Sequence, residues 1–105
     1  MHSYRFENKI HFVIDDNSDN VSSFNMAEEF LRKKKGFVLK EYKPPFWFSG
    51  LMDFTLDNTN LILNYHDMGG TELVLSSEDV SEETKRYIQL LLEEILNKIN
   101  GDNTA

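Results

Sequence analysis

The sequence contains no cysteine, and it has no long apolar run. The first absence excludes disulfide bonds, thiolate nucleophiles and zinc sites that use cysteine. The second argues against a transmembrane helix, which needs roughly 20 consecutive apolar residues. Residues 1–7 (MHSYRFE) also lack the apolar centre of a signal peptide. We therefore expect a cytoplasmic protein that does not enter a membrane.

Positive charge is also scarce, because 11 lysine and arginine residues stand against 18 aspartate and glutamate residues, for a net charge of −7. Nucleic-acid binding needs clustered basic side chains, so this balance argues against it. The one basic run, residues 32–35 (RKKK), lies where we expect a helix to end, and cations there complement the helix dipole. An acidic surface instead favours association with a basic protein partner.

The hydrophobic and aromatic content of the chain is typical of a folded domain. The chain has 105 residues, of which 40% are hydrophobic and 12% aromatic. A chain of this length buries roughly two thirds of its unfolded surface, which is enough for one core. We expect a single domain over residues 1–101, followed by a frayed C-terminal tail at residues 102–105.

The stretch at residues 44–56 (PPFWFSGLMDFTL) has the strongest strand pattern. Its even positions are apolar except for Gly50, whereas its odd positions mix apolar and polar side chains. An alternation of this period places the even set against a core and the odd set on the opposite face. The pattern predicts one long strand in the middle of an antiparallel sheet. The even positions predicted to be in the core are Phe46, Phe48, Met52, Phe54 and Leu56.

Four further strands are expected around it. Residues 4–14 alternate as one half-buried strand with a kink at Asn8, and residues 37–42 form a strand that the prolines at 44–45 end. Residues 61–66 and 72–76 complete the sheet. Keeping one apolar face predicts these cross-strand pairs: Leu56–Leu61, Phe54–Leu63, Met52–Tyr65, Tyr65–Leu73 and Leu63–Leu75.

Two amphipathic helices are expected. The first covers residues 21–35 and ends at Gly36; the second is capped by Ser81 and ends at residues 100–101. The element order is then β-α-β-β-β-β-α. This order predicts an α+β fold with a mostly antiparallel five-stranded sheet and two helices packed on one face. Strands joined by a crossover helix run parallel, so the loop at 15–20 and the turn at Asp67 should share one end of the sheet, opposite the turn at 57–60 and the acidic segment 78–83.

The sequence contains weak signals for catalysis and for metal binding. The loop that begins at Asp15 starts like a calcium loop, but its twelfth position holds Met26 instead of a bidentate carboxylate. His66 with Asp53 and His11 could form an acid–base site, and ordinary surface polar residues explain the same pattern. No glycine-rich phosphate loop and no nucleophile elbow occurs. We expect no cofactor, no metal and no catalytic residue.

The face of the sheet away from the core is the more informative surface. Its odd positions place Trp47 and Leu51 among polar residues such as Asp53. A solvated face with scattered apolar residues is one interpretation. The other is a contact surface, because a tryptophan in a polar-rimmed patch has the composition of an interface hot spot.

In size, acidity and α+β layout, the whole chain resembles the small acidic cytoplasmic immunity proteins that bacteria pair with contact-dependent growth-inhibition toxins and other polymorphic toxins. The resemblance implies a one-to-one inhibitor of a cognate toxin, often a basic nuclease domain, whose active site is occluded by carboxylates. The candidate partner-binding residues are Asp15, Asp16, Asp19 and Asp67 at one end, Glu78, Asp79, Glu82 and Glu83 at the other, and Trp47, Leu51 and Asp53 on the sheet face.

Two other classes of function remain open. The chain could be a secretion chaperone or small adaptor that dimerises through the Trp47 face, so both a monomer and a homodimer are compatible with the sequence. It could also be a small hydrolytic enzyme that uses His66 and a carboxylate. An immunity protein without enzymatic activity is the interpretation that we prefer.

Overall fold

The computed structural model describes residues 2–17, 21–46, 49–66, 69–76 and 80–103, and its fold is α+β with an antiparallel sheet, as the sequence predicts. Within these residues the sheet has six strands, one more than expected. The strands are β1 (His2–Phe6), β2 (Lys9–Asp15), β3 (Phe37–Phe46), β4 (Ser49–Leu56), β5 (Thr59–His66) and β6 (Gly70–Leu75), and the helices are α1 (Val21–Arg32) and α2 (Glu82–Asn103).

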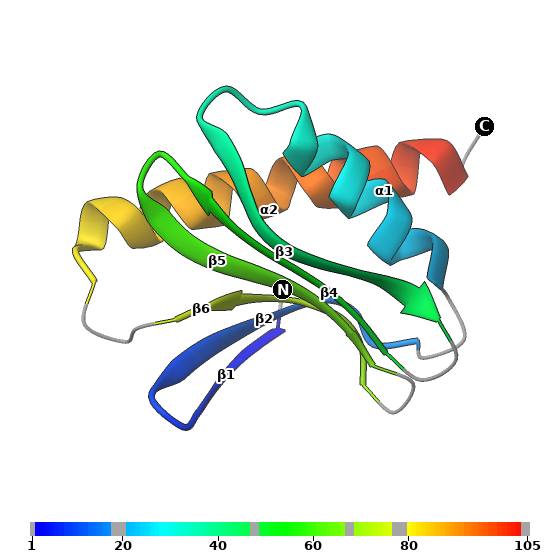
Figure 1. Cartoon of the computed structure of the whole chain (residues 1–105), viewed down its shortest axis with the longest axis horizontal. Coiled ribbons are helices and arrows are strands. Elements are labelled where there is room, and N and C mark those ends of the chain that lie inside the picture. The colour runs from blue at the N-terminus through cyan, green and yellow to red at the C-terminus, as the bar shows by residue number, and fades with distance from the viewer. Residues whose placement is uncertain (1, 18–20, 47–48, 67–68, 77–79, 104–105) are drawn as a thin grey trace.

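The strand order is β1-β2-β6-β5-β4-β3, and every neighbouring pair is antiparallel. Strands β2 and β3 therefore run in the same direction although they are not neighbours, and α1 connects them across the sheet (Figure 1). β1 and β3 are the two edge strands. No helix in the described part of the chain is long and apolar enough to cross a membrane.

The prediction of one kinked strand over residues 4–14 is wrong. The chain reverses at Glu7 and Asn8, so that β1 and β2 form a hairpin. Both turn residues have positive φ angles, 53° and 63°, as a two-residue turn of the twisted hairpin type requires. Asparagine adopts this conformation readily, but glutamate does not, so the sequence gives only half of the usual turn signal.

The prediction of one long middle strand over residues 44–56 is also wrong. β3 continues through Pro44 and Pro45 to Phe46, β4 starts at Ser49, and Phe46 pairs with Ser49. Phe46 is 72% exposed instead of buried. The prolines are tolerated because β3 is an edge strand whose register shifts before Phe46. Residues 47–48, which include Trp47, lie outside the described residues.

The predicted registers are displaced by two residues, but the predicted faces are correct. The turn between β4 and β5 is formed by Asp57 and Asn58, with φ angles of 50° and 65°, and Leu56 lies opposite Thr59 instead of Leu61. As a result Phe54 lies opposite Leu61, and Leu63 lies opposite Met52 on one side and Leu73 on the other. A shift of two residues keeps each side chain on its face, so the core side of these strands is unchanged.

One cluster of buried side chains contains residues from one face of the sheet and from both helices. Figure 1 shows α1 and α2 on the same side of the sheet. Burying an aliphatic or aromatic side chain of this size contributes about 1.5–3 kcal/mol. The helix residues in this core recur at the spacing of an amphipathic helix, as predicted: Phe24, Ala27 and Leu31 in α1, and Ile88, Leu91, Leu92, Ile95 and Ile99 in α2.

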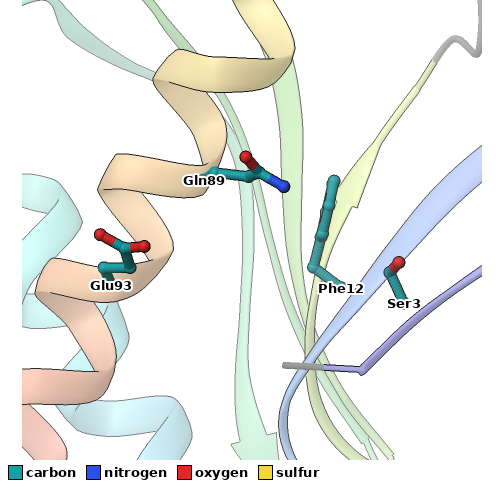
Figure 2. A pocket seen from close by; sticks show the side chains of 4 residues that line it. All are labelled: Ser3, Phe12, Gln89 and Glu93. Atoms are coloured by element: carbon teal, nitrogen blue, oxygen red, sulfur yellow. The ribbon is translucent and has the colours of Figure 1, made fainter.

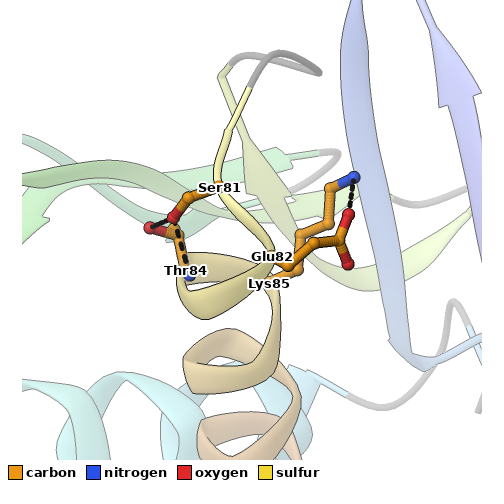
Figure 3. Close-up of polar contacts among 4 residues, drawn as sticks. All are labelled: Ser81, Glu82, Thr84 and Lys85. Carbon is orange, nitrogen blue, oxygen red and sulfur yellow. Dashed lines mark hydrogen bonds and ion pairs between the residues drawn. The ribbon is translucent and has the colours of Figure 1, made fainter.

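The helix ends follow local chemistry. The backbone N–H of Thr84 donates to the Ser81 hydroxyl at 3.1 Å, which confirms the predicted cap of α2, and Lys85 lies 3.4 Å from Glu82 (Figure 3). α2 continues to Asn103, past the predicted end. α1 ends at Arg32, earlier than predicted, and Gly36 has the expected positive φ, 88°.

Candidate protein-binding face

The side of the sheet opposite the helices, here called the open face, is covered by no helix of the described chain. Its residues alternate with those of the core along each strand. Along β2, β4 and β5 most of them are half-buried, and Val74 on β6 is buried by its neighbours. The open face comprises Tyr4, Phe6, Lys9, His11, Val13, Val38, Glu41, Lys43, Phe46, Ser49, Leu51, Asp53, Thr55, Ile62, Asn64, His66, Glu72 and Val74.

A cluster of three polar side chains joins three strands of this face. The Tyr4 hydroxyl on β1 donates to Glu72 Oε1 on β6 at 2.5 Å. His11 Nδ1 on β2 lies 3.0 Å from Glu72 Oε2, and a carboxylate at that distance accepts the Nδ1 proton. One carboxylate therefore holds the other two side chains in fixed positions.

The imidazole of His11 is enclosed by aromatic rings. The Tyr4 ring stacks on it with centroids 4.6 Å apart and planes 9° apart, and the Phe6 ring meets its edge at 6.4 Å. His11 Nε2 is buried and has no hydrogen-bond partner in the described part of the chain. A nitrogen closed off in this way does not reach a substrate unless the β1 residues move aside.

The Tyr4 phenol is kept in its protonated form. Burial, the hydrogen bond to Glu72 and the negative charge of Glu72 together raise the pKa of Tyr4 to about 12. At neutral pH the hydroxyl acts as a hydrogen-bond donor, because a phenolate at this position would face the Glu72 carboxylate. These three side chains, Tyr4, His11 and Glu72, are here called the clamp, because their hydrogen bonds hold three strands together.

A hollow of about 360 Å³ opens beside this clamp. Strand β6 lies between His11 on β2 and His66 on β5. Both nevertheless line this hollow, because the β6 residue opposite His66 is Gly70, which has no side chain. The remaining lining residues are Tyr4, Phe6, Asn64, Gly69 and Glu72.

Leu51 and Asp53, two of the predicted contact residues, lie half-buried on the open face as expected. Leu51 pairs with Lys43 on β3, and Asp53 pairs with Glu41. This part of the face is therefore a mixture of charged and apolar side chains. Trp47, the third predicted contact residue of the face, is outside the described residues.

The acidic residues at the end of β2 have a structural role. The Asp15 carboxylate accepts from the Ser23 hydroxyl at 2.5 Å and from the backbone N–H of Asn17 at 2.9 Å, which ties the strand to α1. Asp16 is exposed. Asp19 and Asp67, predicted at the same end, are outside the described residues.

The opposite end brings together acidic residues that are distant in the sequence. Glu83 at the start of α2 and Asp57 in the β4–β5 turn line one shallow hollow of about 210 Å³. The Tyr87 hydroxyl donates to Asp57 Oδ2 at 3.2 Å, and burial followed by this contact raises the pKa of Tyr87. Glu82 is exposed beside them, whereas Glu78 and Asp79 are outside the described residues.

Sequence reasoning missed Tyr4, Glu72 and Asp57. The first two meet only because a hairpin folds β1 back beside β2 and because β6 pairs with β2, and no local pattern encodes that second pairing. Within the described ranges, no group of three or more histidine, aspartate or glutamate side chains is placed to hold a metal ion. Comparisons of the chain with protein-family models, with curated proteins and with solved structures each found no match.

Proposed function

We propose that this chain is a protein-binding module that neutralises a basic partner, in the manner of the bacterial immunity proteins that it resembles. The observation that carries the proposal is the open face, a sheet surface with no helix over it and with exposed aromatic rings at its border. Phe46 is 72% exposed and Phe6 is 59% exposed, each beside polar neighbours. Aromatic anchors within a polar surround are typical of interface hot spots.

Charge supports a basic partner. The chain has a net charge of −7, and Asp16, Glu82, Glu83 and Asp57 expose carboxylates at the two ends of the sheet. Such a surface attracts a basic protein over about a Debye length, roughly 8 Å at physiological salt, and speeds the encounter. The open face then supplies the apolar contact area. We place this binding in the cytoplasm, because a chain without cysteine suits a reducing compartment.

The clamp of Tyr4, Glu72 and His11 favours binding over catalysis. Its tyrosine is a hydrogen-bond donor with a raised pKa, and its free imidazole nitrogen is buried. A general base needs an exposed lone pair within hydrogen-bond reach of a substrate proton. We propose that the clamp instead keeps the β1–β2 corner of the open face rigid, which lowers the entropy lost on binding.

Co-expression with the basic C-terminal domain of a toxin encoded beside this gene tests the proposal. The expected result is co-purification in a one-to-one complex and protection of the host from the toxin. Phe46→Ser should weaken both, because it removes an aromatic ring from the open face. Leu90→Ser is the matched control, since Leu90 is 54% exposed on α2, away from that face. A neighbouring domain that neither binds nor is neutralised contradicts the proposal.

A further inference from the structure

The two edges of the sheet differ in how they resist pairing with another strand. β3 contains Pro44 and Pro45, two register shifts and the charged pair Glu41–Lys43. Features of this kind block the addition of a strand. β1 has five residues, no proline and one formal charge at Arg5, and in the described chain no strand lies on its outer side. The open edge of the sheet is therefore β1.

The backbone geometry of the β1–β2 hairpin shows which groups face outwards. In a two-residue hairpin the residues that flank the turn, here Phe6 and Lys9, form a hydrogen-bonded pair. Hydrogen-bonded and non-hydrogen-bonded pairs then alternate along the ladder. The N–H and C=O groups of Ser3 and Arg5 consequently point to the outer edge, and those of Tyr4 point to β2.

A groove follows this edge on the helix side of the sheet. Figure 2 shows the residues around one part of it, with Ser3 on β1, Gln89 and Glu93 on α2, and Phe12 at its side. This hollow has a volume of about 270 Å³. The adjoining part, about 200 Å³, is lined by Ser3, Phe12 and Gln89 together with Arg5, Ile10 and Lys85. The groove thus has a cationic end at Arg5 and an acidic end at Glu93.

We propose that β1 pairs with β1 of a second copy of this chain, antiparallel and about a twofold axis at Tyr4. In that register Ser3 lies opposite the partner's Arg5, and Arg5 lies opposite the partner's Ser3. These are the residues whose backbone groups face outwards, so both become hydrogen-bonded pairs and supply four hydrogen bonds. The two sheets join into one, and their open faces become continuous.

Charge complementarity selects a second copy as the occupant of the groove. Side chains opposite each other in a ladder share a face, so the partner's Arg5 enters the hollow beside Ser3, where Glu93 lies. Glu93 is exposed, and no ion pair or hydrogen bond engages its carboxylate within the described residues. The twofold axis makes this contact twice, which offsets part of the repulsion between two chains of net charge −7.

In the same register, the side chains of the two open faces also meet across the twofold axis. Tyr4 lies on the twofold axis, in a non-hydrogen-bonded pair with the partner's Tyr4, and such pairs bring side chains closest. Tyr4 is 39% exposed although its hydroxyl is held by Glu72, so its ring is presented at a fixed angle. Aromatic cross-strand pairs of this kind stabilise a ladder.

Sedimentation velocity over a concentration series tests the proposal. The expected species is a dimer of twice 12.3 kDa that dissociates on dilution. Ser3→Pro removes an outward N–H without breaking a bond to β2, so it should yield a folded monomer, with the fold checked by circular dichroism. A wild-type chain that stays monomeric throughout the series, or a Ser3→Pro chain that dimerises as the wild type does, overturns the proposal.

A charge exchange identifies the contact independently of any effect on folding. Arg5→Glu and Glu93→Arg should each weaken dimerisation, by about tenfold or more for two lost ion pairs, and the double variant should recover it. Lys35→Glu is the control for net charge, because Lys35 is exposed and lies outside the groove. Single variants that dimerise normally, or a double variant that does not recover, contradict the pairing of Arg5 with Glu93.

Discussion

The Tyr4 hydroxyl on the edge strand donates to Glu72 across the intervening strand β2, and 68 positions in the sequence separate the two residues. This side-chain bond links the β1–β2 hairpin to β6, in addition to the backbone hydrogen bonds between β2 and β6. Because His11 shares the same carboxylate, the corner of the open face is fixed by three side chains.

Replacing Tyr4 with phenylalanine should destabilise the protein by about 1–3 kcal/mol, because a half-buried carboxylate loses its hydrogen-bond donor. Equilibrium unfolding in urea measures the change. Tyr87→Phe is the matched control, since it removes the same atom from a longer bond to the exposed Asp57, and it should cost less. Equal losses in the two variants contradict the role assigned to the Tyr4–Glu72 bond.

The stabilisation that Tyr4 contributes should be lost at alkaline pH. Its folded pKa is about 12, above the ordinary tyrosine value of 10.0, so the protonated form is the one that the fold favours. The contribution is therefore complete below pH 10 and is lost as the pH rises towards 12. Tyrosinate absorbance should show a late ionisation that Tyr4→Phe removes. The later titrations of Tyr42 and Tyr87, whose pKa values are also raised, should remain in that variant.

Glu28 should contribute more to the stability of the fold than its neighbour Glu29. Glu28 accepts from the Tyr42 hydroxyl at 2.6 Å and from Arg32 Nε at 2.7 Å, and the Arg32 guanidinium lies 4.7 Å from the centre of the Tyr42 ring. Glu28→Ala should therefore cost about 1–3 kcal/mol by freeing α1 from β3. Glu29→Ala removes exposed ion pairs with Lys33 and Lys98 and should destabilise the protein less than Glu28→Ala does. Thermal unfolding of the two variants compares them directly, and the reverse ranking contradicts the account.

The two adjacent glycines before β6 should respond differently to alanine. Gly70 has a φ of 77°, and an added Cβ would lie 2.0 Å from the backbone oxygen of Asp15, which cannot move without displacing β2. Gly70→Ala should destabilise the fold by roughly 1–3 kcal/mol or more. No atom lies within 4 Å of a Cβ added at Gly69, so Gly69→Ala should be nearly neutral. Similar melting temperatures for the two variants contradict the close approach of β6 to the end of β2.

The sequence predicts what depends on local periodicity. Both amphipathic helices and the core faces of β2, β4, β5 and β6 agree with the prediction, because a spacing of 3.6 or 2 residues identifies one apolar side of an element. Phe46, which was predicted to be in the core, is exposed. The same periodicity does not distinguish two registers that differ by two residues, so the sequence predicts the pair Phe54–Leu63, whereas Phe54 lies opposite Leu61. The turn at Glu7 and Asn8 has no glycine, so the sequence does not predict the β1–β2 hairpin.

The candidate site depends on strand order, which local patterns do not encode. Pro44 and Pro45 end a central strand but not an edge strand, so their effect follows from the position of β3 in the sheet. In the same way, Tyr4, His11 and Glu72 meet because β6 pairs with β2, and Asp57 and Glu83 line one hollow because the β4–β5 turn lies beside the start of α2. The sequence predicts the correct face for Leu51 and Asp53, because that prediction depends only on the alternation of odd and even positions along one strand.

The most direct test of the open face as the binding surface is the change in methyl NMR resonances when the basic partner domain is added. Leu51 and Ile62 report from the open face, and Leu90 reports from the outer side of α2. The account predicts that the Leu51 and Ile62 methyl resonances shift on binding while those of Leu90 do not. Shifts at Leu90 with Leu51 and Ile62 unchanged would place the partner on the helices and contradict it.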